Sequence, residues 1–92
     1  MKVVFDARAA DDLIQIYSWI AVENPLAAAG VAETILAGVE RLAVYPLIGR
    51  IGKVESTREW VVPRLPYIVV YQVDQVRDLL RVIAVFHGAQ DR

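Results

Sequence analysis

The hydrophobic pattern of this chain changes from a helical to a strand-like period near Tyr45-Pro46, and that change restricts the fold more than any other feature of the sequence. Before this point, two stretches repeat their apolar residues every three or four positions, which is the period of one helix face. After it come three runs rich in Val, Ile and Tyr, residue types that favour strands. A short β-type run over residues 2–5 precedes the helices. The predicted element order is therefore β-α-α-β-β-β.

The first half of the chain predicts an antiparallel helix hairpin. The first helix follows Asp6, whose carboxylate we expect to accept hydrogen bonds from the open amides of the first turn. Asn24-Pro25 separates the two helices, because Asn caps well and Pro at the first helical position lacks only an amide that would have no partner. The second helix is expected over about residues 25–43, and so short a connection makes the two helices antiparallel. The apolar stripes are Ala9, Leu13, Ile16 and Ile20 in the first helix and Ala28, Ala32 or Val31, Ile35, Val39 and Leu42 in the second.

The second half predicts three strands, over residues 58–62, 67–73 and 79–86, after a loop that covers residues 49–57. A helix hairpin can cover only one face of a sheet, so the other face needs a second cover or is a binding surface. The last strand is largely apolar on both faces, so its second face cannot simply be left to solvent. Its alternation predicts Arg81, Ile83 and Val85 on one face and Leu80, Val82, Ala84 and Phe86 on the other.

These elements predict a single α+β domain over residues 1–92. In it a helix hairpin packs on a twisted, mainly antiparallel sheet, with the N-terminal strand added at one side. The chain is 57% hydrophobic with a mean hydropathy of +0.40, which is high for 92 residues, since a small domain has little interior. We interpret the excess as surface that a partner covers. The alternative is that abundant Ala and Val raise the count without forming patches.

Several classes of site are excluded by composition. The chain has no cysteine, so neither a disulfide framework nor a thiolate zinc site is possible. It has no metal-ligand spacing, no phosphate-binding loop and no nucleophile with a nearby base, and we expect no cofactor and no metal. The N-terminal apolar run is too short for a signal peptide, and no uncharged stretch approaches the ~20 residues that span a bilayer. We expect a cytoplasmic protein without a membrane partner.

Charge is distributed unevenly along the chain, whose net charge is −1. Residues 1–49 carry three basic and six acidic groups, for a net charge of −3. Residues 50–92 carry seven basic and five acidic groups, for a net charge of +2. The chain as a whole does not have the charge of a polyanion binder, but its C-terminal half is compatible with a polar target.

Short motifs in the second half resemble a known family when they are taken in order. They are a Pro46-x-x-Gly49-Arg50 turn, a Thr57-Arg58-Glu59 strand start, a Tyr67-x-x-x-Tyr71 strand and a Val85-x-His87-Gly88 ending. Together with Asn24-Pro25 and the helix that precedes it, they resemble the ParE/RelE superfamily of bacterial toxins over nearly the whole chain. The resemblance implies a type II toxin that a small, ParD-like antitoxin holds inactive.

The resemblance offers two mechanisms, and departures from the RelE pattern favour the other branch. RelE-type members cleave messenger RNA on the ribosome, chemistry that needs basic groups around the phosphate and the 2′-hydroxyl. Where such members carry lysines, an arginine and a further basic residue, this chain has residues 60–62, Ile68 and residues 88–89. ParE-type members resemble non-catalytic poisons of DNA gyrase. We therefore expect a gyrase-binding toxin with no catalytic residue and no sequence-specific nucleic-acid binding by the toxin alone.

Two alternatives stay open at this point. The first is a ribosome-dependent messenger RNA endonuclease that uses His87 and the arginines of the sheet. The second is a toxin-derived interaction module that has lost its activity.

Four residues are candidates for binding the target: Arg58, Arg64, Arg81 and His87. The arginines could point from the sheet towards an acidic surface, or could instead pair with Glu55, Glu59 or Asp78 as solvated ion pairs of little energy. His87 is the only histidine, and a lone histidine more often has a packing or capping role than a catalytic one.

A second set of residues is the candidate surface for the antitoxin: Ile14, Tyr17, Ala21 and Trp60. The first three form an apolar edge beside the core stripe of the first helix, and Trp60 could anchor an interface. The alternative is that the sheet covers both edges of the helix. Arg50 is expected to hold its loop through hydrogen bonds to backbone carbonyls.

Overall fold

The computed structural model describes residues 1–89 and has the predicted element order with one added strand. The added strand is β2, two residues inside the stretch predicted as a loop. The other predicted bounds agree with the structure to within one residue. The elements are β1 (Lys2–Phe5), α1 (Ala7–Ala21), α2 (Pro25–Val44), β2 (Arg50–Ile51), β3 (Arg58–Val61), β4 (Tyr67–Asp74) and β5 (Leu79–His87).

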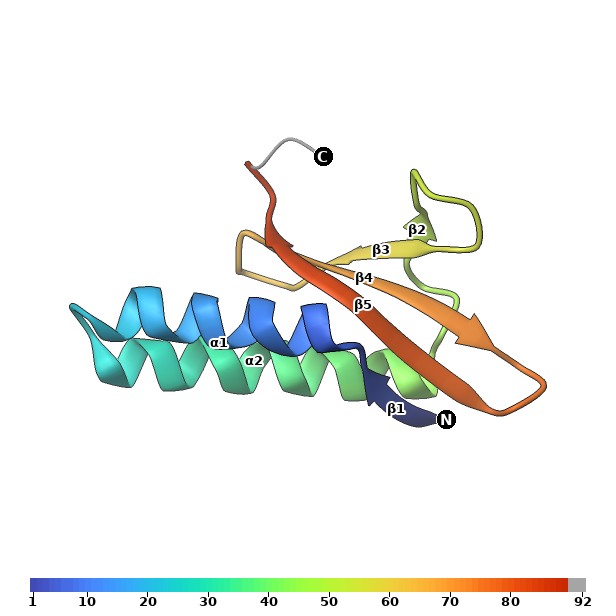
Figure 1. Cartoon of the computed structure of the whole chain (residues 1–92), viewed down its shortest axis with the longest axis horizontal. Helices are drawn as coiled ribbons and strands as arrows, with labels where there is room; N and C mark the ends of the chain where they lie inside the picture. The colour runs from blue at the N-terminus through green and yellow to red at the C-terminus, as the bar shows by residue number, and fades with distance from the viewer. Residues whose placement is uncertain (90–92) are drawn as a thin grey trace.

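All five strands form one mixed sheet in the order β1-β5-β4-β3-β2. β1 pairs in parallel with the first half of β5, and the other neighbours are antiparallel, which confirms the predicted sheet. The helix hairpin packs on one face of this sheet, and its turn end extends past the strands (Figure 1). The molecule is therefore elongated, with a longest dimension of 42 Å.

The N-cap residues of the two helices use their side chains differently. Asn24 caps α2 as predicted, because its Oδ1 accepts a hydrogen bond of 3.0 Å from the Ala27 amide, and Pro25 follows at the first position. The prediction for Asp6 is wrong in part. Asp6 is the N-cap residue of α1, but its carboxylate makes no capping bond and instead accepts from Arg81 Nη1 at 2.9 Å. A charged partner on β5 offers this carboxylate a stronger bond than the amides of the first turn.

A register shift in the β4–β5 pair corrects the predicted faces of the last strand. Val70 lies opposite Ala84 but Tyr71 lies opposite Val82, so Ile83 is an extra residue on β5. Such a bulge reverses the alternation that follows it. Val85 therefore points into the main core together with Leu80 and Val82, whereas Ala84 points to the opposite face.

The face of the sheet away from the helices is also partly covered. Ile68, Val70 and Ala84 are buried there, outside the main core cluster. Glu59 lies in the same cross-strand row as Val70 and Ala84 and is 7% exposed. Its bonds to Arg50 and to the Lys53 amide attach the segment of residues 50–53 to this face. This segment supplies part of the second cover that the apolar strand required.

Close packing of α2 on β3 depends on a glycine. A Cβ placed on Gly38 would lie 2.7 Å from Cζ3 of the Trp60 ring, a distance that only a hydrogen at this position allows. Trp60 fills that space and packs against the main core. A larger residue at this position would therefore force the Trp60 ring to move.

Candidate functional site

A set of hydrogen bonds fixes the loop between α2 and β2, where the Pro46-x-x-Gly49-Arg50 motif lies. The buried Tyr71 hydroxyl donates to the Pro46 carbonyl at 2.7 Å and accepts from the Gly49 amide at 3.0 Å. Arg58 Nη1 donates to the Gly49 carbonyl at 2.8 Å and to the Leu47 carbonyl at 3.4 Å. Gly49 lies so close to Tyr71 that an added Cβ would meet the hydroxyl oxygen at 2.5 Å. The motif is thus a loop anchored at several points from one face of the sheet.

Burial raises the pKa of the Tyr71 hydroxyl above its ordinary value of 10.0. The hydrogen bond with Gly49 and the nearby Arg58 charge act in the opposite direction and oppose this rise only in part. Tyr71 is therefore neutral at physiological pH, with its proton directed at the Pro46 carbonyl.

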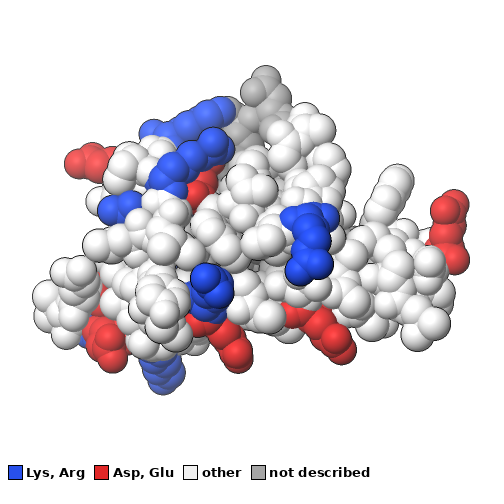
Figure 2. Space-filling model, turned by 180° about the vertical axis from the view of Figure 1, so that it is seen from behind, with Lys and Arg blue, Asp and Glu red and all other residues white. Residues whose placement is uncertain are grey.

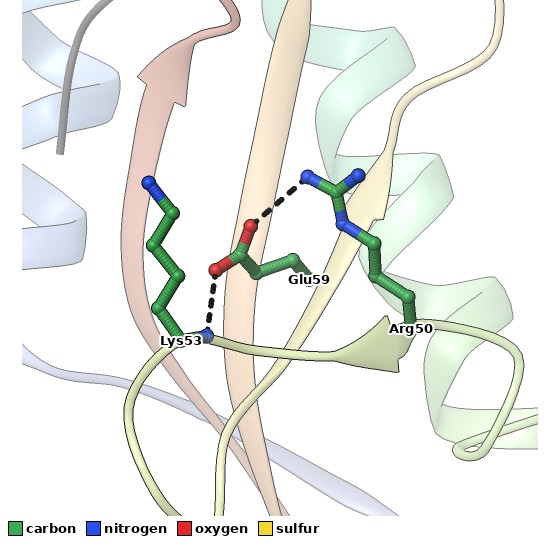
Figure 3. A network of polar contacts seen from close by, with 3 residues as sticks. All are labelled: Arg50, Lys53 and Glu59. Atoms are coloured by element: carbon green, nitrogen blue, oxygen red, sulfur yellow. Dashed lines mark hydrogen bonds and ion pairs between the residues drawn. The ribbon is translucent and has the colours of Figure 1, made fainter.

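The prediction for Arg50 is wrong, because Arg58 and Arg50 have exchanged the expected roles. Arg58 is the residue that holds the loop carbonyls, whereas Arg50 Nη2 lies 3.2 Å from Glu59 Oε1. The second carboxylate oxygen of Glu59 accepts from the Lys53 amide at 3.3 Å (Figure 3). Strand pairing explains the exchange, since Arg50 lies directly opposite Glu59 while Arg58 points to the helix face with Tyr71.

The four candidates for target binding lie at two opposite ends of the sheet. Arg58 and Arg81 both line an open hollow of about 770 Å³ beside the β4–β5 turn. Each has an internal partner there, because Arg58 binds the loop carbonyls and Arg81 binds Asp6. The expected pairs with Glu55 or Asp78 do not form at these two arginines. Their charges are thus committed largely to holding the fold.

The remaining two candidates lie at the other end, where β3 ends, β4 begins and β5 ends. His87 is opposite Tyr67, and their rings meet edge to face with centroids 5.6 Å apart. His87 Nδ1 also accepts from the Ala89 amide at 3.0 Å. Arg64 lies in the turn that precedes Tyr67, and its side chain is exposed. The structure therefore favours the packing and capping role of His87, and leaves Arg64 pointing to solvent.

A second hollow, of about 800 Å³, opens beside this end between α1 and β5. Ile16, Trp19, Phe86 and His87 are among the residues that line it. Asp12 lies in its wall and accepts a hydrogen bond of 2.9 Å from the Val85 amide, on the part of β5 that β1 does not reach. This contact could not be predicted from local sequence pattern, because it joins residues 73 positions apart.

Three of the candidate antitoxin residues lie on α1, and the fourth lies on β3. Ile14 is 62% exposed and Tyr17 is 43% exposed, so the outer edge of α1 is an uncovered apolar surface, as its wide stripe indicated. Ala21 lies one turn further along and is half-buried. Trp60 lies against α2 instead, where it fills the space at Gly38. Other large apolar residues, which were not predicted as part of this surface, are exposed at the turn end of the hairpin: Trp19, Val22 and Leu26.

Charged side chains are distributed differently at the turn end of the hairpin and over the rest of the surface. From behind, Lys and Arg side chains gather over the part of the surface away from the hairpin turn (Figure 2). The turn end at the right of that view shows acidic and uncharged side chains. The part of the chain that the structure describes holds no group of three or more His, Cys, Asp or Glu suited to a metal ion. Within residues 1–89, no helix is both long enough and apolar enough to cross a membrane.

Comparison with known proteins identifies the family. Residues 3–92 match the family described as the ParE toxin of the type II toxin–antitoxin system parDE. The chain belongs to the ParE toxin family. It is thus a toxin of a type II toxin–antitoxin system, as the motifs predicted.

Two relatives and two solved structures are similar to this ParE-family chain. The candidate toxin Y4kP of Sinorhizobium fredii is 37% identical over 82 residues, which cover 89% of this chain and 85% of that protein. Toxin RelE2 of Caulobacter vibrioides is 33% identical over 89 residues, 97% of each chain. The chromosomal ParDE system of P. aeruginosa aligns with a TM-score of 0.83 at 22% identity, over 95% of each chain. The E. coli RelBE toxin–antitoxin complex aligns with a TM-score of 0.73 at 18% identity, over 99% of this chain and 98% of that one. The two structures confirm the predicted fold.

Proposed function

We propose that this toxin stops bacterial growth by binding and poisoning DNA gyrase, as a single cytoplasmic domain, and that a ParD-like antitoxin neutralises it. The proposal rests on the residues that an RNase would need, because they are either bonded within the fold or replaced by apolar residues. Two of the three candidate arginines are engaged by Asp6 and by loop carbonyls, and His87 is packed on Tyr67 with Nδ1 already bonded. The positions that RelE-type members fill with basic groups are apolar here. These features support a toxin that acts by binding.

The antitoxin surface in this proposal is the outer edge of α1. Ile14 and Tyr17 lie one turn apart and are both exposed, which suits an amphipathic segment that folds on the toxin as it binds. The match to a toxin of the parDE system, and the fold shared with toxin–antitoxin complexes, support such a partner.

Expression of the chain alone in bacteria tests the proposed target. A gyrase poison should stop division and induce the DNA-damage response while translation continues. Pulse labelling of new protein, together with a reporter of that response, measures both effects. Translation that halts within minutes, with messages cut at codon boundaries, would establish the ribosomal RNase instead. Unimpeded growth would favour the inactivated module.

The same cells test the antitoxin surface. Co-expression of the cognate antitoxin should restore growth to cells that carry the wild-type toxin but not to cells that carry the double variant Ile14→Asp, Tyr17→Asp. Burying two charges at an apolar interface should lower the affinity of the toxin for the antitoxin by at least about 30-fold. Leu36→Asp is the matched control, because Leu36 is a comparably exposed apolar residue on α2, and this variant should still be neutralised. Rescue of the double variant as complete as that of the wild type would rule out this edge of α1.

A further inference from the structure

The turn that joins β3 to β4 has an unusual residue at its tightest position. Val62, Pro63, Arg64 and Leu65 form it, and the Leu65 amide donates to the Val62 carbonyl at 3.2 Å. Pro at the second position and a positive φ of 66° at the third are the features of a type II turn. The third position of such turns favours Gly or Asn, and this chain has an arginine there.

Arginine at a positive φ is a conformation that L-residues seldom adopt, because the Cβ crowds the backbone. Two other residues of the described chain share it, but they are the short polar residues Ser56 and Asp78, and Asp is among the types that tolerate it best. At Arg64 the chain keeps a long cationic side chain where glycine would relax the turn. Strain of this kind is typical of sites where a side chain serves a function.

The Arg64 side chain makes no hydrogen bond or ion pair within residues 1–89, unlike the two other arginines predicted to bind the target. Arg81 binds Asp6, and Arg58 binds the Gly49 carbonyl. Arg64 therefore keeps its full hydrogen-bonding capacity of five N–H donors for a partner outside the chain.

The turn holds Arg64 in a fixed place. Pro63 and Pro66 flank it and restrict the backbone on both sides. The Val62 amide donates to the Tyr67 carbonyl at 2.9 Å, and the Gly88 amide at the end of β5 donates to the Pro66 carbonyl at 2.6 Å. The backbone of so constrained a turn loses little conformational entropy when Arg64 binds, which favours recognition.

The surroundings of Arg64 fit a protein partner better than a nucleic acid. Its neighbours along the turn are uncharged, and Val61 at the end of β3 is exposed. A single guanidinium set among apolar residues is typical of an energetic centre in a protein interface. Binding to a nucleic-acid backbone instead requires several cations that follow the phosphates.

We propose that Arg64 is the main contact of this toxin with its target, and that its guanidinium binds a carboxylate on a protein. The inference rests on the proposed function, because it supposes a toxin that acts by binding. It goes further in assigning target recognition to the turn between β3 and β4 and in excluding Arg58 and Arg81 from that role.

Substitution by glycine separates function from folding at this position. Arg64→Gly removes the charge and also relaxes the backbone, so its Tm should be unchanged or higher by up to about 5 °C. The cellular amount of the chain that arrests growth, measured by immunoblot, should rise at least about tenfold, as expected for loss of a charged interface contact. Arg64→Asn should behave like Arg64→Gly, whereas Arg64→Lys should keep part of the potency because it keeps the charge.

Asp78→Gly is the control, since it relaxes a positive φ at the opposite end of the sheet and should leave potency unchanged.

If the wild type arrests growth and Arg64→Gly is equally potent, this inference is overturned while the proposed function stands. A wild-type chain that leaves growth unaffected would contradict the proposed function, and the inference with it. A fall in Tm on Arg64→Gly would show a structural role and overturn the inference. Retention of a labelled DNA duplex at physiological salt by the wild type, lost on Arg64→Gly, would overturn the assignment to a protein carboxylate.

Discussion

At the scale of the residue, single polar atoms decide how the exposed parts of this toxin are held. Tyr71 is the clearest case, because one hydroxyl satisfies two backbone groups of the loop between α2 and β2. The sequence located Tyr71 in a strand but gave no sign of these bonds, since their partners are 22 and 25 positions away. The same holds for Asp6 and Arg81, which are 75 positions apart. The sequence shows which residues can form hydrogen bonds, but the fold decides which residues are their partners.

Tyr71→Phe should lower the free energy of unfolding by about 1–3 kcal/mol, because it leaves the Gly49 amide and the Pro46 carbonyl without their partner. Chemical denaturation measures the change. Tyr45→Phe is the control, since the Tyr45 ring is exposed and stacks on Arg41 without a hydrogen bond from its hydroxyl, and it should change stability little. Equal stabilities for Tyr71→Phe and the wild type would show that the loop is not held by this hydroxyl.

The pH dependence of stability follows from the same hydroxyl. The folded-state pKa of Tyr71 is raised above the value of 10.0, so the unfolded chain ionises first as pH rises. The stabilisation is therefore complete below about pH 10 and is lost as pH rises from there through the folded-state pKa. The wild type should lose more stability than Tyr71→Phe between about pH 9 and about pH 11.

At the scale of the element, the strong periodicities were sufficient to predict the helices and the long strands to within a residue. Two features could not be predicted from local pattern. The strand β2 has only two residues, and one of them, Arg50, lies opposite its ion-pair partner Glu59 on β3. The bulge at Ile83 lies in a strand that is apolar on both faces, so no polar residue marks the point where the alternation reverses.

Two glycines of α2 should respond in opposite ways to the same substitution. Gly30→Ala should stabilise the protein by about 0.5–1 kcal/mol, because no atom lies within 4 Å of the new Cβ and alanine favours the helix. Gly38→Ala should destabilise it by about 1–3 kcal/mol despite the same helical preference, because the Trp60 ring would have to move. Thermal unfolding of both variants measures the difference. Stabilisation by both would mean that α2 and β3 are not packed as described.

At the scale of the whole molecule, the hairpin and the sheet divide the surface into regions of different chemistry. The hairpin exposes apolar residues along α1 and at its turn, where Trp19 is 81% exposed. Basic side chains gather over the part away from that turn (Figure 2). This division explains how 57% hydrophobic composition coexists with a chain of 92 residues, since part of the apolar surface is left for a partner. We propose that the antitoxin binds the outer edge of α1 and that the target binds Arg64 in the turn between β3 and β4, so the two partners would contact different elements of the fold.

We propose that this ParE-family toxin inhibits gyrase by binding it. The most direct measurement is the supercoiling of relaxed plasmid by purified gyrase as the wild-type chain is added, beside cleavage of a message on translating ribosomes. If the toxin binds gyrase, supercoiling should fall with increasing toxin, added antitoxin should restore it, and the message should stay intact. Full supercoiling at every toxin concentration, together with a message cut on the ribosome, would contradict the proposal.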